Sequence, residues 1–235
     1  MIGRRYVHLT PRTQAALELL GTGRVAADVG CDHGRLTAAL LQQDRFERVV
    51  ASDVSADSLE KARALLGYIG VADRVSLRVG DGLSVLSPGE CDAIAMLGMG
   101  GTLMARILDA APVPLMGAQS IVLQPMRAQS DIRAYLHRNR YRITEERIVR
   151  ERDRLYELLR AVPDASVQQF PEGWPEGFYD VGFVAWEQSD PLLDELLDRQ
   201  EKRLLSQCTE ARGTAGEAIL LQKLAAIEAI RRMER

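Results

Sequence analysis

The residue types best suited to chemistry stand together in the stretch 28–34, DVGCDHG. Its glycines would let a ligand approach the backbone closely, and N–H groups at the start of a following helix can bind a carboxylate or a phosphate. The dinucleotide-binding fingerprint has glycine where Asp32 stands, and a second acid would repel a pyrophosphate. The stretch therefore favours a ligand that carries a cationic amine or sulfonium. We expect His33 to form a wall of the site rather than to act as a base.

Two further acids follow predicted strands. Asp53 comes 23 residues after Gly30, the spacing of an acid that accepts ribose hydroxyls; its alternative role is to cap a helix. Asp81 can accept the exocyclic amine of adenine, or it can be an ordinary turn residue. Three acids in this order favour S-adenosylmethionine as cofactor and S-adenosylhomocysteine as product. The expected cofactor-binding residues are Asp28, Gly30, Cys31, Asp32, His33, Gly34, Asp53, Val54, Gly80, Asp81, Gly82 and Gly98.

The elements that must position these residues alternate between strand and helix. Apolar runs predict strands at 25–28, 49–52, 75–79, 93–97 and 120–123, and helices at 13–20, 35–43, 56–66, 102–110 and 128–139. This alternation specifies a parallel sheet with helices on both faces, whose ligand crevice lies at the carboxyl ends of the strands. Every candidate motif follows such an end.

The pattern changes after residue 140. Two β-like runs, 141–149 and 154–162, predict an antiparallel hairpin at the sheet edge. An α/β chain of this kind resembles the Rossmann-like class I methyltransferase fold, with a mostly parallel seven-stranded sheet that ends in an antiparallel hairpin. Leucine and isoleucine at helical spacing over 192–230 predict a C-terminal helical hairpin, similar to a short coiled coil. We expect a methyltransferase domain over 1–165 and a helical domain over 166–235.

Composition limits the class of protein. The 235 residues are 46% hydrophobic and 27% charged, as in ordinary globular proteins, and no apolar run approaches the ~20 residues that span a bilayer. The first residues contain no apolar signal core. The three cysteines, Cys31, Cys91 and Cys208, follow no metal or disulfide spacing. We expect a cytoplasmic protein with no metal, no membrane association and no obligate protein partner.

The charge distribution leaves room for a nucleic-acid partner. A net charge of −3 argues against a protein that coats nucleic acid on all sides, yet residues 127–160 contain ten arginines and only six acids. The excess indicates either a solvated helix face and hairpin or a surface that contacts phosphates. On the second interpretation, Arg133, Arg138 and Arg140 lie on the crevice side and Arg12 joins them, with Arg4 and Arg5 as an alternative.

Several blocks together resemble the bacterial tRNA (adenine(22)-N(1))-methyltransferase family. The blocks are 28–33 (DVGCDH, where the family has DIGSDH), 80–83, 98–101, 123–125 and 141–157. The resemblance extends over about residues 9–165. The chain departs from the family at Cys31, where the family has serine, at Met126, where a polar residue is expected after Gln-Pro, and at Gly34 and Arg35, where the family has a more apolar pair. The second departure concerns contacts with the target base.

The resemblance implies that S-adenosylmethionine donates a methyl group to N1 of adenine 22 of a tRNA partner. Adenine N1 carries a lone pair, so the enzyme must mainly position the two reactants and offer an acceptor to the N6 amine. Backbone carbonyls at 97–99, or Gln124, are candidates for that acceptor. The expected positioning residues are Gly98, Met99, Gln124 and Asp32.

Two other functions stay open at this point. A methyltransferase of the same fold could act on another RNA site or on a small molecule, and the latter predicts a capped, apolar acceptor pocket. A non-catalytic RNA-binding scaffold predicts no cofactor binding. The three strand-end acids argue against the scaffold.

Overall fold

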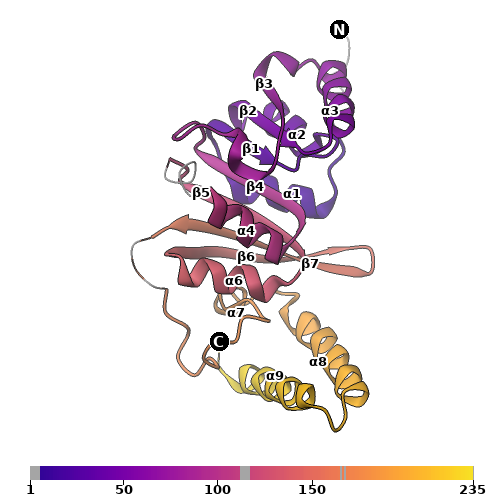
Figure 1. Ribbon diagram of the computed structural model, residues 1–235, viewed down its shortest axis with the longest axis vertical. Helices are drawn as coiled ribbons and strands as arrows, with labels where there is room; N and C mark the ends of the chain where they lie inside the picture. Colours follow the sequence, from indigo (N-terminus) through magenta and orange to yellow (C-terminus); the bar gives the residue numbers. More distant parts are fainter. Residues whose placement is uncertain (1–5, 112–116, 165, 167, 235) are drawn as a thin grey trace.

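A seven-stranded sheet forms the centre of the protein, in the order β3-β2-β1-β4-β5-β7-β6 (Figure 1). The computed structural model describes residues 6–111, 117–164, 166 and 168–234. Strands β1 to β5 pair in parallel, whereas β7 is antiparallel to both β5 and β6. The predicted parallel sheet with an antiparallel hairpin at its edge is confirmed. The strands are β1 (Gly23–Val29), β2 (Phe46–Asp53), β3 (Val75–Val79), β4 (Ala93–Gly100), β5 (Ser120–Arg127), β6 (Tyr141–Glu151) and β7 (Arg154–Pro163).

Helices cover both faces of the sheet because the strands are apolar on both sides. Successive strand residues point to opposite faces, so Ile94 and Met96 belong to one buried cluster and Ala93 and Ala95 to the other. The helices α4, α6 and α7 contribute to the first cluster, and α1, α2 and α3 to the second. The helices are α1 (Pro11–Leu20), α2 (Arg35–Gln42), α3 (Ala56–Ile69), α4 (Gly101–Ala110), α6 (Gln129–Arg138), α7 (Phe183–Glu187), α8 (Leu193–Glu210) and α9 (Ala215–Arg232), with short 3-10 turns η1 (Ala72–Arg74) and η2 (Gly82–Val85).

The strand order reverses at β1, and this reversal creates a crevice. The chain runs from β1 outward to β2 and β3, and then returns to β4 on the other side of β1. The helices after β1 and β4 therefore lie on opposite faces, α2 on one and α4 on the other (Figure 1). Ligands of open α/β sheets bind at such a point, outside the carboxyl ends of the strands.

The segment after β7 packs onto the sheet. Trp174, Phe178, Phe183 and Trp186 are buried in the same cluster as β4 and β5, and the rings of Trp174 and Trp186 meet edge to face with centroids 6.0 Å apart. These contacts cross the expected boundary between residues 165 and 166, which itself stays a prediction. Residues 170–187 therefore complete the core beside β6.

The helices α8 and α9 form the predicted C-terminal hairpin, drawn in orange and yellow in Figure 1. The buried leucines of α8 and isoleucines of α9 join the cluster that α4, α6 and α7 build. The rest of the hairpin extends away from the sheet, with Leu205, Ile219 and Leu221 exposed. One end of the hairpin is thus anchored in the core.

A buried arginine joins the last segments of the sheet. Arg133 of α6, only 1% exposed, donates from Nε to Glu146 of β6 at 2.7 Å and from Nη2 to Glu157 of β7 at 2.5 Å. Oε2 of Glu146 also accepts the backbone N–H groups of Val184 and Ala185 in α7, at 3.0 and 3.1 Å. Burial works to lower the pKa of Arg133, but the two carboxylates raise it, so the guanidinium stays charged. The prediction that Arg133 contacts RNA is wrong, because its charge is neutralised inside the protein.

Replacing Arg133 should be far more costly than replacing an arginine on the surface of the same helix. Arg133→Met leaves Glu146 and Glu157 buried without their cation, a loss of roughly 3–5 kcal/mol in the free energy of unfolding. Arg138→Met, on an exposed residue of the same helix, is the matched control and should change it by less than about 0.5 kcal/mol. Urea unfolding of both variants measures the difference. Equal midpoints would show that the buried ion pairs contribute nothing.

Candidate functional site

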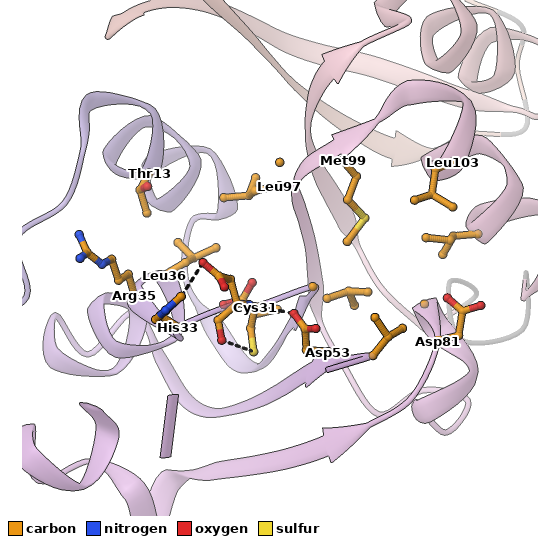
Figure 2. Close-up of a pocket in the computed structure, with 18 of the residues that line it drawn as sticks. Thr13, Cys31, His33, Arg35, Leu36, Asp53, Asp81, Leu97, Met99 and Leu103 are labelled. Atoms are coloured by element: carbon orange, nitrogen blue, oxygen red, sulfur yellow. Dashed lines mark hydrogen bonds and ion pairs between the residues drawn. The ribbon is translucent and has the colours of Figure 1, made fainter. Parts of the chain in front are cut away.

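A cleft of about 600 Å³ opens at the carboxyl ends of β1 to β4, within the roughly 300–1,000 Å³ typical of small-molecule sites. Apart from Gly34, every residue predicted to bind the cofactor lines it. In Figure 2, Asp53 lies between the Cys31 loop and Asp81. Among the other lining residues, the sequence did not predict Thr10, Thr13, Val29, Arg35, Leu36, Leu103 and Ile107.

Asp28 is buried beneath the cleft and holds the start of α2. Gly34 stands at the N-cap of this helix and has no side chain to cap it. Instead, Oδ2 of Asp28 accepts the backbone N–H of Thr37 at 3.1 Å and its hydroxyl at 2.7 Å. Burial raises the pKa of Asp28 to about 6, and the negative charge of Asp53 adds to the rise, although the two hydrogen bonds from Thr37 lower the pKa. The loop after β1 is therefore fixed by a carboxyl group that titrates near neutral pH.

Asp53 fixes the same loop from the end of β2. Its Oδ2 accepts the N–H of Asp32 at 3.1 Å, and its Oδ1 accepts the N–H of Ser55 at 2.9 Å. A carboxylate can accept about four hydrogen bonds, so two remain for ribose hydroxyls. Ser55, and not Asp53, is the N-cap of α3 and accepts the N–H of Ser58. Asp81 is exposed at the far end of the cleft.

The acidic loop carries an exposed contact between Asp32 and His33 and a buried thiol. Asp32 has a φ of 50°, a left-handed conformation that aspartate tolerates, and Oδ2 of Asp32 lies 2.7 Å from Nδ1 of His33. Burial, together with the charges of Asp28 and Asp53, raises the pKa of Cys31. Cys31 therefore stays a neutral thiol and lacks the thiolate that a nucleophile requires.

Met99 reaches from β4 across the cleft toward the loop after β1 (Figure 2). Gly30 has a φ of 72°, which glycine adopts at little cost, and a Cβ at this position would lie 2.2 Å from Cε of Met99. A side chain at residue 30 would therefore displace Met99. Glycine therefore lets Met99 lie close against the backbone of the loop.

Gln124 lies beneath the cleft rather than in its lining. It is fully buried, and its Oε1 accepts the N–H of Gly98 and Nη1 of Arg12, each at 3.2 Å. Because these partners can only donate, the oxygen must face them and both its lone pairs are used. The suggestion that Gln124 accepts from the target base is therefore wrong. Gln124 instead positions Gly98, which lines the cleft with Met99 and Asp32.

Arg12 and Met126 extend this contact to the mouth of the cleft. The sulfur of Met126 accepts from Nη1 of Arg12 at 3.3 Å and from Nε2 of Gln124 at 3.6 Å. The guanidinium of Arg12 also lies over the ring of Tyr156, 4.8 Å from its centroid. Met126, which stands where a polar residue was expected, therefore still supplies a hydrogen-bond acceptor through its sulfur.

Besides Gln124 and the buried Arg133, three predicted site residues do not line the cleft. A Cβ at Gly34 would lie 2.9 Å from Cβ of Ala62, so this glycine lets α2 approach α3. Arg138 and Arg140 are exposed, but they lie at the amino end of β5, opposite the cleft. The start of β6, which follows them, pairs with the end of β7, and that part of β7 pairs with the start of β5. The expectation that they lie on the crevice side is wrong, because α6 runs back from the carboxyl end of β5.

The described part of the chain offers neither a metal site nor a membrane-spanning helix. It contains no group of three or more histidine, cysteine or acidic residues placed to hold a metal. Within the same residues, no helix combines the length and apolar character needed to cross a membrane. The alternative phosphate contacts, Arg4 and Arg5, lie outside the described residues.

Comparison with known proteins connects this geometry to a family. Residues 9–159 match the family described as Methyltransferase domain. Over 153 residues the chain is 35% identical to the tRNA (adenine(22)-N(1))-methyltransferase of Bacillus subtilis (strain 168), across 65% of this chain and 64% of that protein, which is less than two thirds of the relative's length. The crystal structure of the B. subtilis M1A22 tRNA methyltransferase TrmK has a TM-score of 0.80 at 27% identity, covering 96% of this chain and 98% of that one. M. capricolum TrmK, in complex with the natural cofactor product S-adenosyl-homocysteine, has the same fold, with a TM-score of 0.74 at 17% identity over 95% and 96% of the chains.

The titration of Asp28 should make stability depend on pH. In the folded chain the carboxyl group of Asp28 has a pKa of about 6, against 3.8 for an ordinary aspartate. Between these two pKa values the folded state binds more protons than the unfolded state, so the free energy of unfolding falls as the pH rises from about 4 to above 6. Between about pH 4.5 and 7.5 the wild type should lose roughly 2 kcal/mol relative to Asp28→Asn, which can still accept both hydrogen bonds from Thr37. Urea unfolding at the two pH values measures this. Asp57→Asn, on the exposed first turn of α3, is the control; a parallel loss in Asp28→Asn would contradict the assignment.

Proposed function

We infer that the chain, which belongs to the Methyltransferase domain family, is a tRNA (adenine(22)-N(1))-methyltransferase like its B. subtilis relative. On this proposal it transfers a methyl group from S-adenosylmethionine to N1 of adenine 22 of a tRNA. The observation that carries the proposal is the gathering of Asp28, Asp53 and Asp81, from three different strand ends, in one cleft. The activity of the B. subtilis relative supports the substrate, and the M. capricolum complex supports the cofactor. A tRNA substrate also favours a cytoplasmic location.

The residues of the cleft fit the groups that this cofactor presents. When bound, S-adenosylmethionine supplies an electrophilic methyl group on a sulfonium. Asp53, with two unused acceptor positions, would take the ribose hydroxyls, and the exposed Asp81 would accept the adenine amine. Asp28 and Asp32 would attract the cationic end of the molecule. Met99, which lies against the backbone of Gly30, forms part of the wall on this side of the cleft.

The chain's part in the reaction is positioning. As the adenine N1 lone pair bonds to the methyl carbon, the carbon–sulfur bond breaks and sulfur keeps its electron pair; the product is cationic until N6 loses a proton. Gly98, held by Gln124, would set the edge against which the base lies, and the carbonyls of 97–99 would accept from N6. Orientation of this kind can supply a large share of a rate enhancement. A paired base must first leave its stack, at a cost of a few kcal/mol.

The proposed reaction is tested by locating the methyl group. Bacterial tRNA transcripts are incubated with the protein and S-adenosylmethionine, and reverse transcription is read for a stop at adenine 22, because a methyl on N1 blocks base pairing. We expect a stop at that position and none in a transcript with guanine there. A stop at another nucleotide would identify a different RNA site. Cofactor binding without any tRNA methylation would favour a small-molecule substrate.

The cofactor site is tested separately by removing Asp53. Loss of charge-assisted hydrogen bonds costs about 1.5–3 kcal/mol each, so Asp53→Ala should weaken S-adenosylhomocysteine binding at least about tenfold in calorimetry. Asp57→Ala, four residues along and outside the cleft lining, is the matched control and should bind like the wild type. Because Asp53 also holds Asp32 and Ser55, circular dichroism should check that the variant is folded. Unchanged affinity in a folded variant would mean that Asp53 only organises the loop.

A further inference from the structure

A second cleft, of about 480 Å³, adjoins the first. It opens between the end of β5, the start of β7 and one side of α8, and its lining includes Met126, Arg154, Tyr156, Arg199, Gln200 and Arg203. We propose that this cleft binds the phosphate and ribose of a nucleotide next to the adenine that is methylated. This inference rests on the proposed function, and it adds a substrate subsite that the cofactor cleft does not contain.

The two clefts share one wall. Arg12 lines the first cleft and Tyr156 the second, and the guanidinium of Arg12 covers the Tyr156 ring. Arg12 also donates to Gln124, the residue that holds Gly98. A nucleic-acid strand with its target base against Gly98 would therefore pass over this wall and bring an adjoining nucleotide to the second cleft.

The charges of the second cleft favour an anion. Its two acids are already paired, because Glu157 is bonded to Arg133 and Asp180 to Lys223 at 2.8 Å. Arg199 is paired with Glu195. Arg154 and Arg203 are exposed, and neither forms a salt bridge or hydrogen bond within the described part of the chain, although the charge of Arg203 reaches Glu157. Two guanidinium groups thus remain for a phosphate.

The side chain of Gln200 favours a ligand that can also donate a hydrogen bond. Its Nε2 donates to the carbonyl of Asp180 at 2.8 Å, while its Oε1 is buried and has no hydrogen-bond partner among the described residues. The side chain is 8% exposed and belongs to the lining of the cleft. A phosphodiester has no proton to donate and would leave this acceptor unpaired, whereas a ribose hydroxyl can donate to it. Phosphate and 2′-hydroxyl together are the mark of an RNA backbone.

The arginines are tested against a matched pair elsewhere on the sheet. Arg154→Gln with Arg203→Gln should raise the Kd for a tRNA transcript at least about tenfold and reduce the slope of log Kd against log salt by about one to two. Arg24→Gln with Arg48→Gln makes the same charge change on exposed residues at the amino ends of β1 and β2, and should change Kd by less than about twofold. Calorimetry with S-adenosylhomocysteine should give the same affinity for all these variants. A Kd for the cleft variant equal to that of the control would overturn the proposal.

The ribose contact has its own test. Replacing the 2′-hydroxyls on either side of the target adenosine by hydrogen should weaken binding to the wild type. Gln200→Leu should weaken binding of the all-RNA transcript and remove most of the difference between the two transcripts, as expected for two groups in contact. An equal difference in wild type and variant would overturn the ribose contact. These experiments measure binding, so they test the second cleft even if the wild type methylates no tRNA. The absence of methylation would refute the proposed function but not the proposed RNA subsite.

Discussion

The buried ion pairs of Arg133 are the interaction on which the second half of the structure depends. One guanidinium joins α6 to β6 and β7, and through Glu146 it also holds the start of α7. The fit leaves no spare room, since a Cβ at Gly182 would lie 2.4 Å from the Glu146 carboxylate. Such a cluster is stable only when every partner is present. It fixes β7, and with it Tyr156 and Glu157, beside both clefts.

The first half depends on topology, with Asp28 as its organising side chain. Parallel strands deliver their following loops to one edge, so acids that are far apart in sequence meet there. A glycine at the start of α2 frees the loop backbone but gives up the usual cap, and the carboxylate of Asp28 takes over that role through Thr37. The same residue thus shapes the loop and contributes negative charge to the cleft.

Much of this could be predicted from the sequence. The strands and the edge hairpin follow from apolar periodicity, and all but one of the residues that the sequence predicted to bind the cofactor do line the cleft. Periodicity does not reveal partners, however. Arg133 stands among exposed arginines and looks solvated, and Gln124 looks free to contact a base; both are buried by residues distant in sequence. Thr37 could have been found from its place three residues after Gly34, where a helix N–H needs an acceptor. The second cleft could not, because α8 reaches β7 only in three dimensions.

The hold of Glu146 on α7 also has a consequence for synthesis on the ribosome. The hairpin of β6 and β7 is complete in sequence by residue 163, yet one of its buried carboxylates finds its last two donors only at residues 184 and 185. Until those residues have emerged from the exit tunnel, this edge of the sheet carries an incompletely bonded charge beneath uncovered apolar surface. The nascent chain is therefore expected to complete its sheet late, in step with the appearance of α7, with the parallel half around β1 ready to fold first.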